Sequence, residues 1–164
     1  MDLFVSRLVD VMESIPDLLL LFALLAVIES PGLSTLIIII AMVKWTVFAK
    51  FTRAEMLRIR NLEFMRSSEV LGNSSWKSLI KHALPNAIQP AIIVFIFGVA
   101  SAILIEAVLS FLGLGVSQDT MTWGKLLSNA RSKPSAWWLA IFPGLAIFLC
   151  VFALNKMGEL LNQE

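Results

Sequence analysis

Long uncharged apolar stretches dominate the chain and predict membrane-spanning helices. A helix needs about 20 mainly apolar residues to cross roughly 30 Å of hydrocarbon. Residues 83–105 and residues 134–155 meet this length without a charged side chain. Residues 30–49 are also long enough and carry one charge, Lys44, near their C-terminal end. These three stretches are predicted to span a membrane.

The N-terminal region is less regular. Residues 18–28 form an apolar run of eleven residues, too short to span alone, so they are predicted to be the first arm of a helical hairpin that turns at Pro31-Gly32. Residues 1–15 place apolar side chains at helical spacing opposite acidic and polar ones, which is typical of an interfacial amphipathic helix. The sequence thus predicts an all-α membrane protein with about four transmembrane helices. The predicted spans occupy residues 16–49 (two spans), 83–114 and 135–155.

The connections between the spans differ in charge, and this predicts their orientation. The connection at 50–82 holds seven Lys or Arg residues against three Glu residues. Because cytoplasmic loops are enriched in Lys and Arg, this connection is predicted to be cytoplasmic. The N-terminal segment and the tail at 156–164 then lie in the cytoplasm as well. The connection at 115–134 becomes an outer loop.

Composition supports the membrane assignment and excludes several other classes of protein. The 164 residues suit one domain; 58% of them are hydrophobic and 15% are charged, and the mean hydropathy is +0.83. Soluble domains are about 25% charged, so an ordinary cytosolic enzyme, a disordered chain and a disulfide scaffold are excluded. The net charge of +1 gives little support to nucleic-acid binding. One cysteine, Cys150, and one histidine, His82, argue against a disulfide or a metal site.

The 50–82 connection is itself predicted to be helical. Residues 55–71 contain good helix formers and place Leu57, Phe64 and Leu71 at heptad spacing. Gly72-Asn73 is expected to stop this helix, because glycine readily adopts the left-handed cap conformation.

A second short helix is expected after this stop. Ser74 or Ser75 can cap its N-terminus, and the helix is predicted to run over residues 76–83 and to end before Leu84-Pro85. The result is a bent pair of short helices with Trp76 exposed near the bend. On periodicity alone, an amphipathic lid on the membrane surface is the favoured interpretation of this pattern.

Particular motifs point to a known family. Residues 64–76, followed by Leu84-Pro85, resemble the EAA cytoplasmic loop of ABC-importer permeases, which has Glu-Ala-Ala, three residues, Gly, a gap and then Leu-Pro; the spacing from Gly72 to Leu84-Pro85 matches without insertion. Residues 15–20 resemble the start of a family span, and residues 106–115 resemble the signature that ends the next-to-last span. Residues 122–124 resemble the outer loop, and residues 137–144 resemble the last span. Together they resemble the dipeptide/oligopeptide/nickel permease subfamily.

The resemblance implies a fold and a function. The fold would be the transmembrane domain of a type I ABC importer that lacks the usual N-terminal spans, since members of the subfamily usually carry about two more spans before the segment matching residues 2–15. The function would be that of a permease subunit, forming half of a translocation path for peptides or a related small solute, with nickel as the main alternative. A truncated, transport-inactive permease fragment or a structural membrane protein remains the alternative function.

The resemblance also implies partners and a location. The expected partners are ABC ATPase subunits, a second permease subunit, an extracytoplasmic solute-binding protein and the lipid membrane, with no nucleic acid. The chain has no phosphate-binding G-x-x-x-x-G-K-[ST] loop, so ATP is expected to be used by the partner ATPase, with no cofactor, metal or catalytic residue on this chain. The expected location is the inner, or cytoplasmic, membrane of a bacterial or archaeal cell.

The family docks its ATPase through the short helix after the glycine, which corresponds here to residues 73–81. The expected ATPase-coupling residues are Arg66, Ser67, Ser68, Gly72, Asn73, Ser74, Ser75, Trp76, Lys77, Leu84 and Pro85. This chain departs from the family pattern in one respect. Where the family has Glu-Ala-Ala-Arg, it has Arg-Ser-Ser-Glu, so the charges at positions i and i+3 are exchanged. An intrahelical ion pair would survive this exchange, whereas a contact from the usual Glu to a basic partner group would not.

Glu106, Ser110 and Lys44 are further candidates, either for the translocation path or for packing. Glu106 would lie about 33 Å along the third span, near the outer interface. A carboxylate within a membrane is a functional candidate, but at that depth a structural partner or hydration is the simpler expectation. Lys44 is expected to reach the headgroups or to pair with an acidic group.

Overall fold

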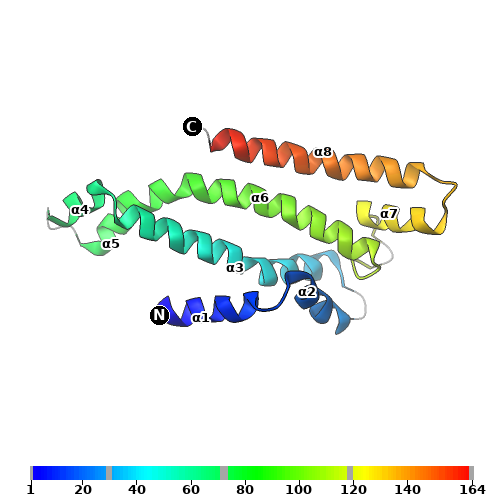
Figure 1. Cartoon of the computed structure of the whole chain (residues 1–164), viewed down its shortest axis with the longest axis horizontal. Coiled ribbons are helices and arrows are strands. Elements are labelled where there is room, and N and C mark those ends of the chain that lie inside the picture. Colours follow the sequence, from blue (N-terminus) through cyan, green and yellow to red (C-terminus); the bar gives the residue numbers. More distant parts are fainter. Residues whose placement is uncertain (1, 29–30, 71–73, 118–119, 163–164) are drawn as a thin grey trace.

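The computed structural model describes residues 2–28, 31–70, 74–117 and 120–162. Three long helices, α3, α6 and α8, run side by side along the molecule, with α4 and α5 at one end and α7 near the other (Figure 1). The helices in chain order are α1 (Asp2–Glu13), α2 (Asp17–Ala26), α3 (Leu33–Arg60), α4 (Glu63–Val70), α5 (Ser75–Ser78), the π-helical turn η1 (Leu79–Ala83), α6 (Leu84–Phe111), α7 (Trp123–Ser132) and α8 (Trp138–Leu161).

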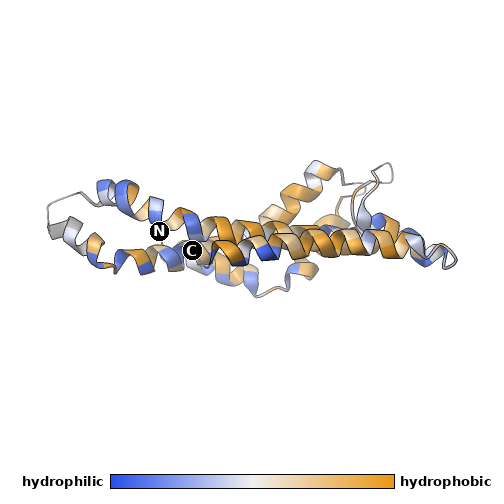
Figure 2. Cartoon of the chain, turned by 90° about the horizontal axis from the view of Figure 1, so that it is seen from above, coloured by the Kyte–Doolittle hydropathy of each residue, from blue (hydrophilic) through white to orange (hydrophobic). Residues whose placement is uncertain are grey.

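The long helices match the three predicted spans. Among the described residues, α3, the continuous helix Trp76–Phe111 and α8 are long and apolar enough to cross a membrane. Hydrophobic residues follow the middle of these helices, and hydrophilic residues gather towards the end that carries α4 and α5 (Figure 2). Large side chains such as Ile37, Phe95 and Phe148 remain exposed on the bundle. This exposed apolar surface suits a lipid environment.

The predicted hairpin arm differs from a fourth span. Its apolar part, α2, has ten residues, so it is about 15 Å long, half the hydrocarbon thickness. Pro16 separates α2 from α1 with extended backbone angles, φ −55° and ψ 131°, because proline lacks an N–H and disfavours helix in the residue before it. The described chain therefore has three helices of spanning length rather than four.

Helices α1 and α2 nevertheless occupy the place of a hairpin arm beside α3 (Figure 1). Ser6 on α1 accepts a hydrogen bond from Arg53 of α3, and Glu13 pairs with Lys50, one turn nearer the N-terminus of α3. Asp17 on α2 then pairs with Lys44. As residue numbers rise on α1 and α2 they fall on α3, so the two short helices together run antiparallel to α3.

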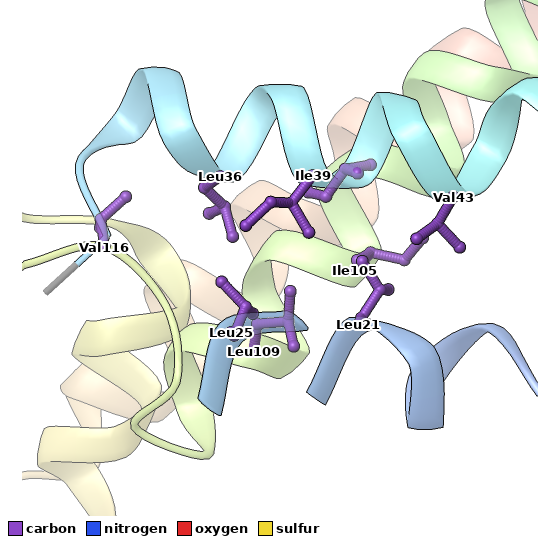
Figure 3. Packing of buried hydrophobic residues seen from close by; sticks show 9 residues of the cluster. Leu21, Leu25, Leu36, Ile39, Val43, Ile105, Leu109 and Val116 are labelled. Atoms are coloured by element: carbon purple, nitrogen blue, oxygen red, sulfur yellow. The ribbon is translucent and has the colours of Figure 1, made fainter. Parts of the chain in front are cut away.

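The main hydrophobic core joins α2, α3 and α6 (Figure 3). On α2, Leu25 lies beside Leu109 of α6 and Leu21 lies beside Ile105 of α6 (Figure 3). Leu21, Leu36 and Leu109 are fully buried. In lipid the release of water contributes little between helices, so close packing is what favours this contact. The core fixes α3 against α6 near the end of the bundle where α7 lies.

The predicted outer loop contains a helix, α7, which the sequence analysis did not anticipate. Thr122 caps it: its side-chain hydroxyl accepts a hydrogen bond from the Lys125 backbone N–H at 3.3 Å. The helix packs against both α6 and α8. Gly124 makes this possible, because a Cβ there would lie 2.8 Å from the Ala107 Cα on α6. The 115–134 connection is thus a packed element that ties the last two long helices together.

Candidate functional site

The predicted coupling loop has a small buried core of its own. Ile59 at the end of α3, Met65 on α4, Ala83 in the π-helical turn and Ala87 on α6 are all buried and form one cluster. The Phe64 ring also contacts the His82 ring, with centroids 6.3 Å apart. Because the cluster takes one residue from each element, α4 and the π-helical turn are held against both long helices.

The second helix of the loop begins as predicted at a serine cap. The Ser74 hydroxyl accepts a hydrogen bond from the Lys77 backbone N–H at 3.4 Å, and the Ser78 N–H donates to the Ser74 carbonyl at 3.0 Å. Trp76 is the second residue of this helix and keeps 69% of its surface exposed. The neighbouring Lys77 is exposed as well. A large aromatic side chain and a cation therefore project from the end of the molecule that carries the loop.

Part of the predicted coupling set lies outside the described residues. This applies to Gly72 and Asn73, and to the side chains of Arg66, Ser68 and Ser75. Ser67 is described, and its hydroxyl donates a hydrogen bond to the Glu63 carbonyl at 2.9 Å within α4. The intrahelical ion pair expected between Arg66 and Glu69 remains a prediction, since both side chains lie outside the described residues.

The prediction that the second helix ends before Leu84-Pro85 is wrong. Helix α5 continues through the π-helical turn into α6, and the Leu84 N–H donates to the Leu79 carbonyl five residues back. In a regular α-helix the Pro85 ring would clash with the carbonyl of Lys81, four residues earlier. The wider π turn accommodates proline without breaking the helix. Trp76 and the third predicted span therefore belong to one continuous helix.

Glu106 has the structural partner that its depth suggested. The Ser110 hydroxyl donates a hydrogen bond to Glu106 Oε1 at 2.6 Å, one turn along α6. Ser110 is buried, and Glu106 is half-buried. Two glycines approach Ser110 closely: a Cβ on Gly115 would lie 2.6 Å from its Cα, and one on Gly124 would lie 2.8 Å from its Cβ.

Lys44 pairs with an acidic group, one of the two alternatives expected for it. Its Nζ lies 2.7 Å from Asp17 Oδ2, in a partly exposed ion pair between α3 and α2. Lys44 and Glu106 do not contact each other, but both line a groove of about 460 Å³ between α3 and α6. Sequence reasoning missed this groove, because it depends on how the two helices are placed side by side.

Sequence reasoning also missed the polar contacts that hold α1 on α3. The available signal was the pair of cations Lys50 and Arg53, together with Glu13 in the preceding segment. Opposite charges on two segments that lie side by side attract each other, so their pairing favours the contact.

Comparison with known proteins agrees with the helical arrangement. Residues 1–163 match the family described as "Binding-protein-dependent transport system inner membrane component". The dipeptide transport system permease protein DppC of Alkalihalophilus pseudofirmus is 35% identical over 159 residues, which are 96% of this chain and 52% of that protein. The di/tripeptide transport system permease protein DppC of Pseudomonas aeruginosa is 38% identical over 156 residues, 94% of this chain and 51% of that protein.

A relative named for a different cargo aligns over the same extent. The glutathione transport system permease protein GsiD of Pectobacterium atrosepticum is 34% identical over 159 residues, 96% of this chain and 52% of that protein. The chain thus spans about half the length of the curated relatives it matches. Because the family match covers nearly the whole chain, the chain belongs to the family of inner membrane components of binding-protein-dependent transport systems.

Proposed function

We propose that the chain is a permease subunit of an ABC importer, forming half of a translocation path and coupled to a separate ATPase through residues 73–81. The observation that supports this most strongly is the coupling loop. Its short helices are anchored by a buried cluster to the ends of two long helices, while Trp76 remains exposed. An anchored helix with an exposed aromatic end is what a docking element requires, since aromatic residues are favoured anchors at protein interfaces.

The proposed mechanism is rigid coupling. Trp76 lies on the same continuous helix as Glu106, so a displacement of α5 by a docked ATPase would be passed along α6. Met65 and Ile59 connect the same movement to the end of α3. Closure of two ATPase subunits would then rock the long helices between inward-open and outward-open states, as in other rigid-body switches. ATP is used by the partner in this proposal.

We extend the proposal to the coupling residues expected from the sequence. Three exposed members act as direct contacts, four members set the bend, and four more complete the docking surface. The contact group is Ser74, Trp76 and Lys77, and the bend group is Gly72, Asn73, Leu84 and Pro85. Arg66, Ser67, Ser68 and Ser75 complete the docking surface.

Peptides are the proposed cargo class. The three relatives above are named for dipeptides, di- and tripeptides, and glutathione, and these names favour a peptide over the nickel alternative. The family description names a binding protein, which supports a solute-binding protein as one partner. A second permease subunit completes the proposed assembly. Selection of the cargo would begin on that binding protein.

The test is recovery of the ATPase with the tagged chain from its own membranes in mild detergent. The informative variant is Trp76→Asp, and the matched control is Met121→Asp, because Met121 is 70% exposed and lies beside α7, away from the loop. We expect a P-loop ATPase and a second permease to be recovered with the unmodified chain and with Met121→Asp. Recovery of the ATPase should fall at least about tenfold for Trp76→Asp, the effect of losing an interface hot spot.

The opposite outcome supports the alternative function. If the folded, membrane-inserted chain recovers no ATPase, it is a transport-inactive fragment or a structural membrane protein. If both variants recover the ATPase equally well, docking does not use Trp76.

A further inference from the structure

The groove between α3 and α6 has the dimensions and the lining of a small-ligand site. Its volume of about 460 Å³ lies within the range of about 300–1,000 Å³ that is usual for ligand pockets. Most of its lining is apolar, and the charged side chains on it are Lys44 from α3 and Glu106 from α6. Trp123 of α7 lines it as well. An apolar cleft with a few polar groups of fixed position is the usual form of such sites.

The register of the two helices gives the axial offset between the backbone positions of Lys44 and Glu106. Helices α3 and α6 are antiparallel, and a Cβ on Gly98 would lie 2.7 Å from the Phe48 ring, so these two residues are level with each other. Counting four residues back along α3 and four forward along α6 places Lys44 level with Ala102. Glu106 lies four residues further along α6, which is about 6 Å along the axis.

Both charged groups keep bonding capacity for a ligand. An ammonium group has three N–H donors, and Lys44 uses one of them on Asp17. A carboxylate has about four acceptor positions, and within the described part of the chain Ser110 is the partner that Glu106 has. Trp123 adds an aromatic face, which attracts cations. The groove therefore offers the Glu106 carboxylate, the Trp123 indole and the Lys44 ammonium on its lining, with the backbone positions of Lys44 and Glu106 offset by about 6 Å along the axis.

We propose that this groove binds a zwitterionic dipeptide, with the peptide ammonium at Glu106 and the peptide carboxylate at Lys44. Two extended residues span at most about 7 Å, a length similar to the axial offset of about 6 Å between the backbone positions of Lys44 and Glu106. The apolar walls accept varied side chains, so the groove selects for chain length and free termini rather than for sequence. This inference rests on the proposed transport function and gives that function a substrate site.

The experiment measures protection of a cysteine placed in the groove. Ala41 is exposed and lines the groove three residues before Lys44. Ala41→Cys is made together with Cys150→Ser and labelled with N-ethylmaleimide in the detergent-solubilised complex purified through the tagged chain. Alanyl-alanine is expected to slow labelling, whereas N-acetyl-alanyl-alanine amide, which lacks both charges, is expected to have no effect. Glu106→Gln and Lys44→Met should each raise the half-protecting concentration at least about tenfold.

The control cysteine is Met121→Cys, which is exposed outside the groove and should label at the same rate with and without dipeptide. Equal protection by the charged and the blocked peptide would overturn the inference, as would no protection by either. A cysteine at position 41 that fails to label without peptide would also overturn it, because the groove would then be filled by protein or lipid. The two peptides are compared on one chain, so this test does not depend on the folding of the charge variants.

ATPase recovered in the same preparation separates this inference from the proposed function. With the ATPase present, loss of dipeptide protection contradicts the groove site alone. With the ATPase absent from the folded complex, the transport function itself is contradicted.

Discussion

Ser110 connects Glu106 to the packing of α7. Its hydroxyl donates a hydrogen bond to Glu106 Oε1 at 2.6 Å. A Cβ on Gly124 of α7 would lie only 2.8 Å from the Ser110 Cβ, so α7 packs directly against this residue. The carboxylate is therefore held by a residue that is itself fixed by a helix-to-helix contact. A change in the position of α7 would reach Glu106 through a single side chain.

Gly124→Ala is expected to loosen this contact. The added Cβ would lie 2.8 Å from both Ala107 Cα and Ser110 Cβ, and a backbone atom cannot move aside as a flexible side chain can. We expect destabilisation of about 1–3 kcal/mol, the usual cost of overpacking. The measurement is the melting temperature of the purified chain in detergent. Gly144→Ala on α8 is the control, since nothing lies within 4 Å of its added Cβ. Equal melting temperatures for the two variants would contradict the close approach.

Ile59→Ala is expected to release the coupling loop. Ile59 is 0% exposed at the centre of the loop's buried cluster, whereas Leu57, two residues earlier, is 50% exposed. Truncation of a buried isoleucine costs about 2–5 kcal/mol, while Leu57→Ala should stay within about 0.5 kcal/mol. The measurement is the rate of limited proteolysis within residues 61–78. The account expects faster cleavage for Ile59→Ala alone; comparable cleavage of both variants would show that the cluster does not anchor the loop.

Pro85→Ala is expected to tighten the π-helical turn. Alanine restores a backbone N–H and removes the ring that would clash, in a regular α-helix, with the carbonyl four residues earlier. The α-helical hydrogen-bond pattern then becomes available through Leu79–Ala83. Helix α5 would then rotate relative to α6. The measurement is the spin-label distance between Lys77→Cys and Lys156→Cys in a Cys150→Ser chain. A shift of several Å is expected, on the scale of one helical turn of about 5.4 Å; an unchanged distance distribution would mean that Pro85 does not set the turn.

The ion pair between Lys44 and Asp17 is expected to contribute modestly to the docking of α2. Polar contacts between membrane helices contribute about 0.6 kcal/mol on average in double-mutant cycles, so we expect a coupling energy of about 0.5–1 kcal/mol for this partly exposed pair. A double-mutant cycle with Lys44→Gln and Asp17→Asn measures it through the melting temperature. Strictly additive effects would show that the pair adds nothing to stability.

The long helices could be predicted from the sequence because lipid imposes a simple requirement of length and apolarity. Three uncharged or nearly uncharged stretches became α3, α6 and α8. Their ends were harder to predict, because a helix that leaves the membrane can continue in water with good helix formers. Helix α3 thus runs on to Arg60, where Asn61 supplies the C-cap. The predicted helix at 55–71 is accordingly divided between α3 and α4.

The candidate site was predictable where it depends on local chemistry. Ser74 as a helix cap and the exposure of Trp76 follow from residue type and position. The π-helical turn was missed, because proline usually ends a helix and a sequence does not show when a wider turn will absorb it. The groove containing Lys44 and Glu106 was also missed, since its two sides are about sixty residues apart in the chain.

Docking of an ATPase on α5 can be tested by cross-linking in intact membranes. A photoreactive benzophenone amino acid replaces Trp76 in one chain and Met121, as the control, in another. We expect an adduct between position 76 and a P-loop ATPase, identified by mass spectrometry, and none from position 121. If an inserted, folded chain yields no ATPase adduct from position 76, or yields it equally from position 121, α5 is not the docking site.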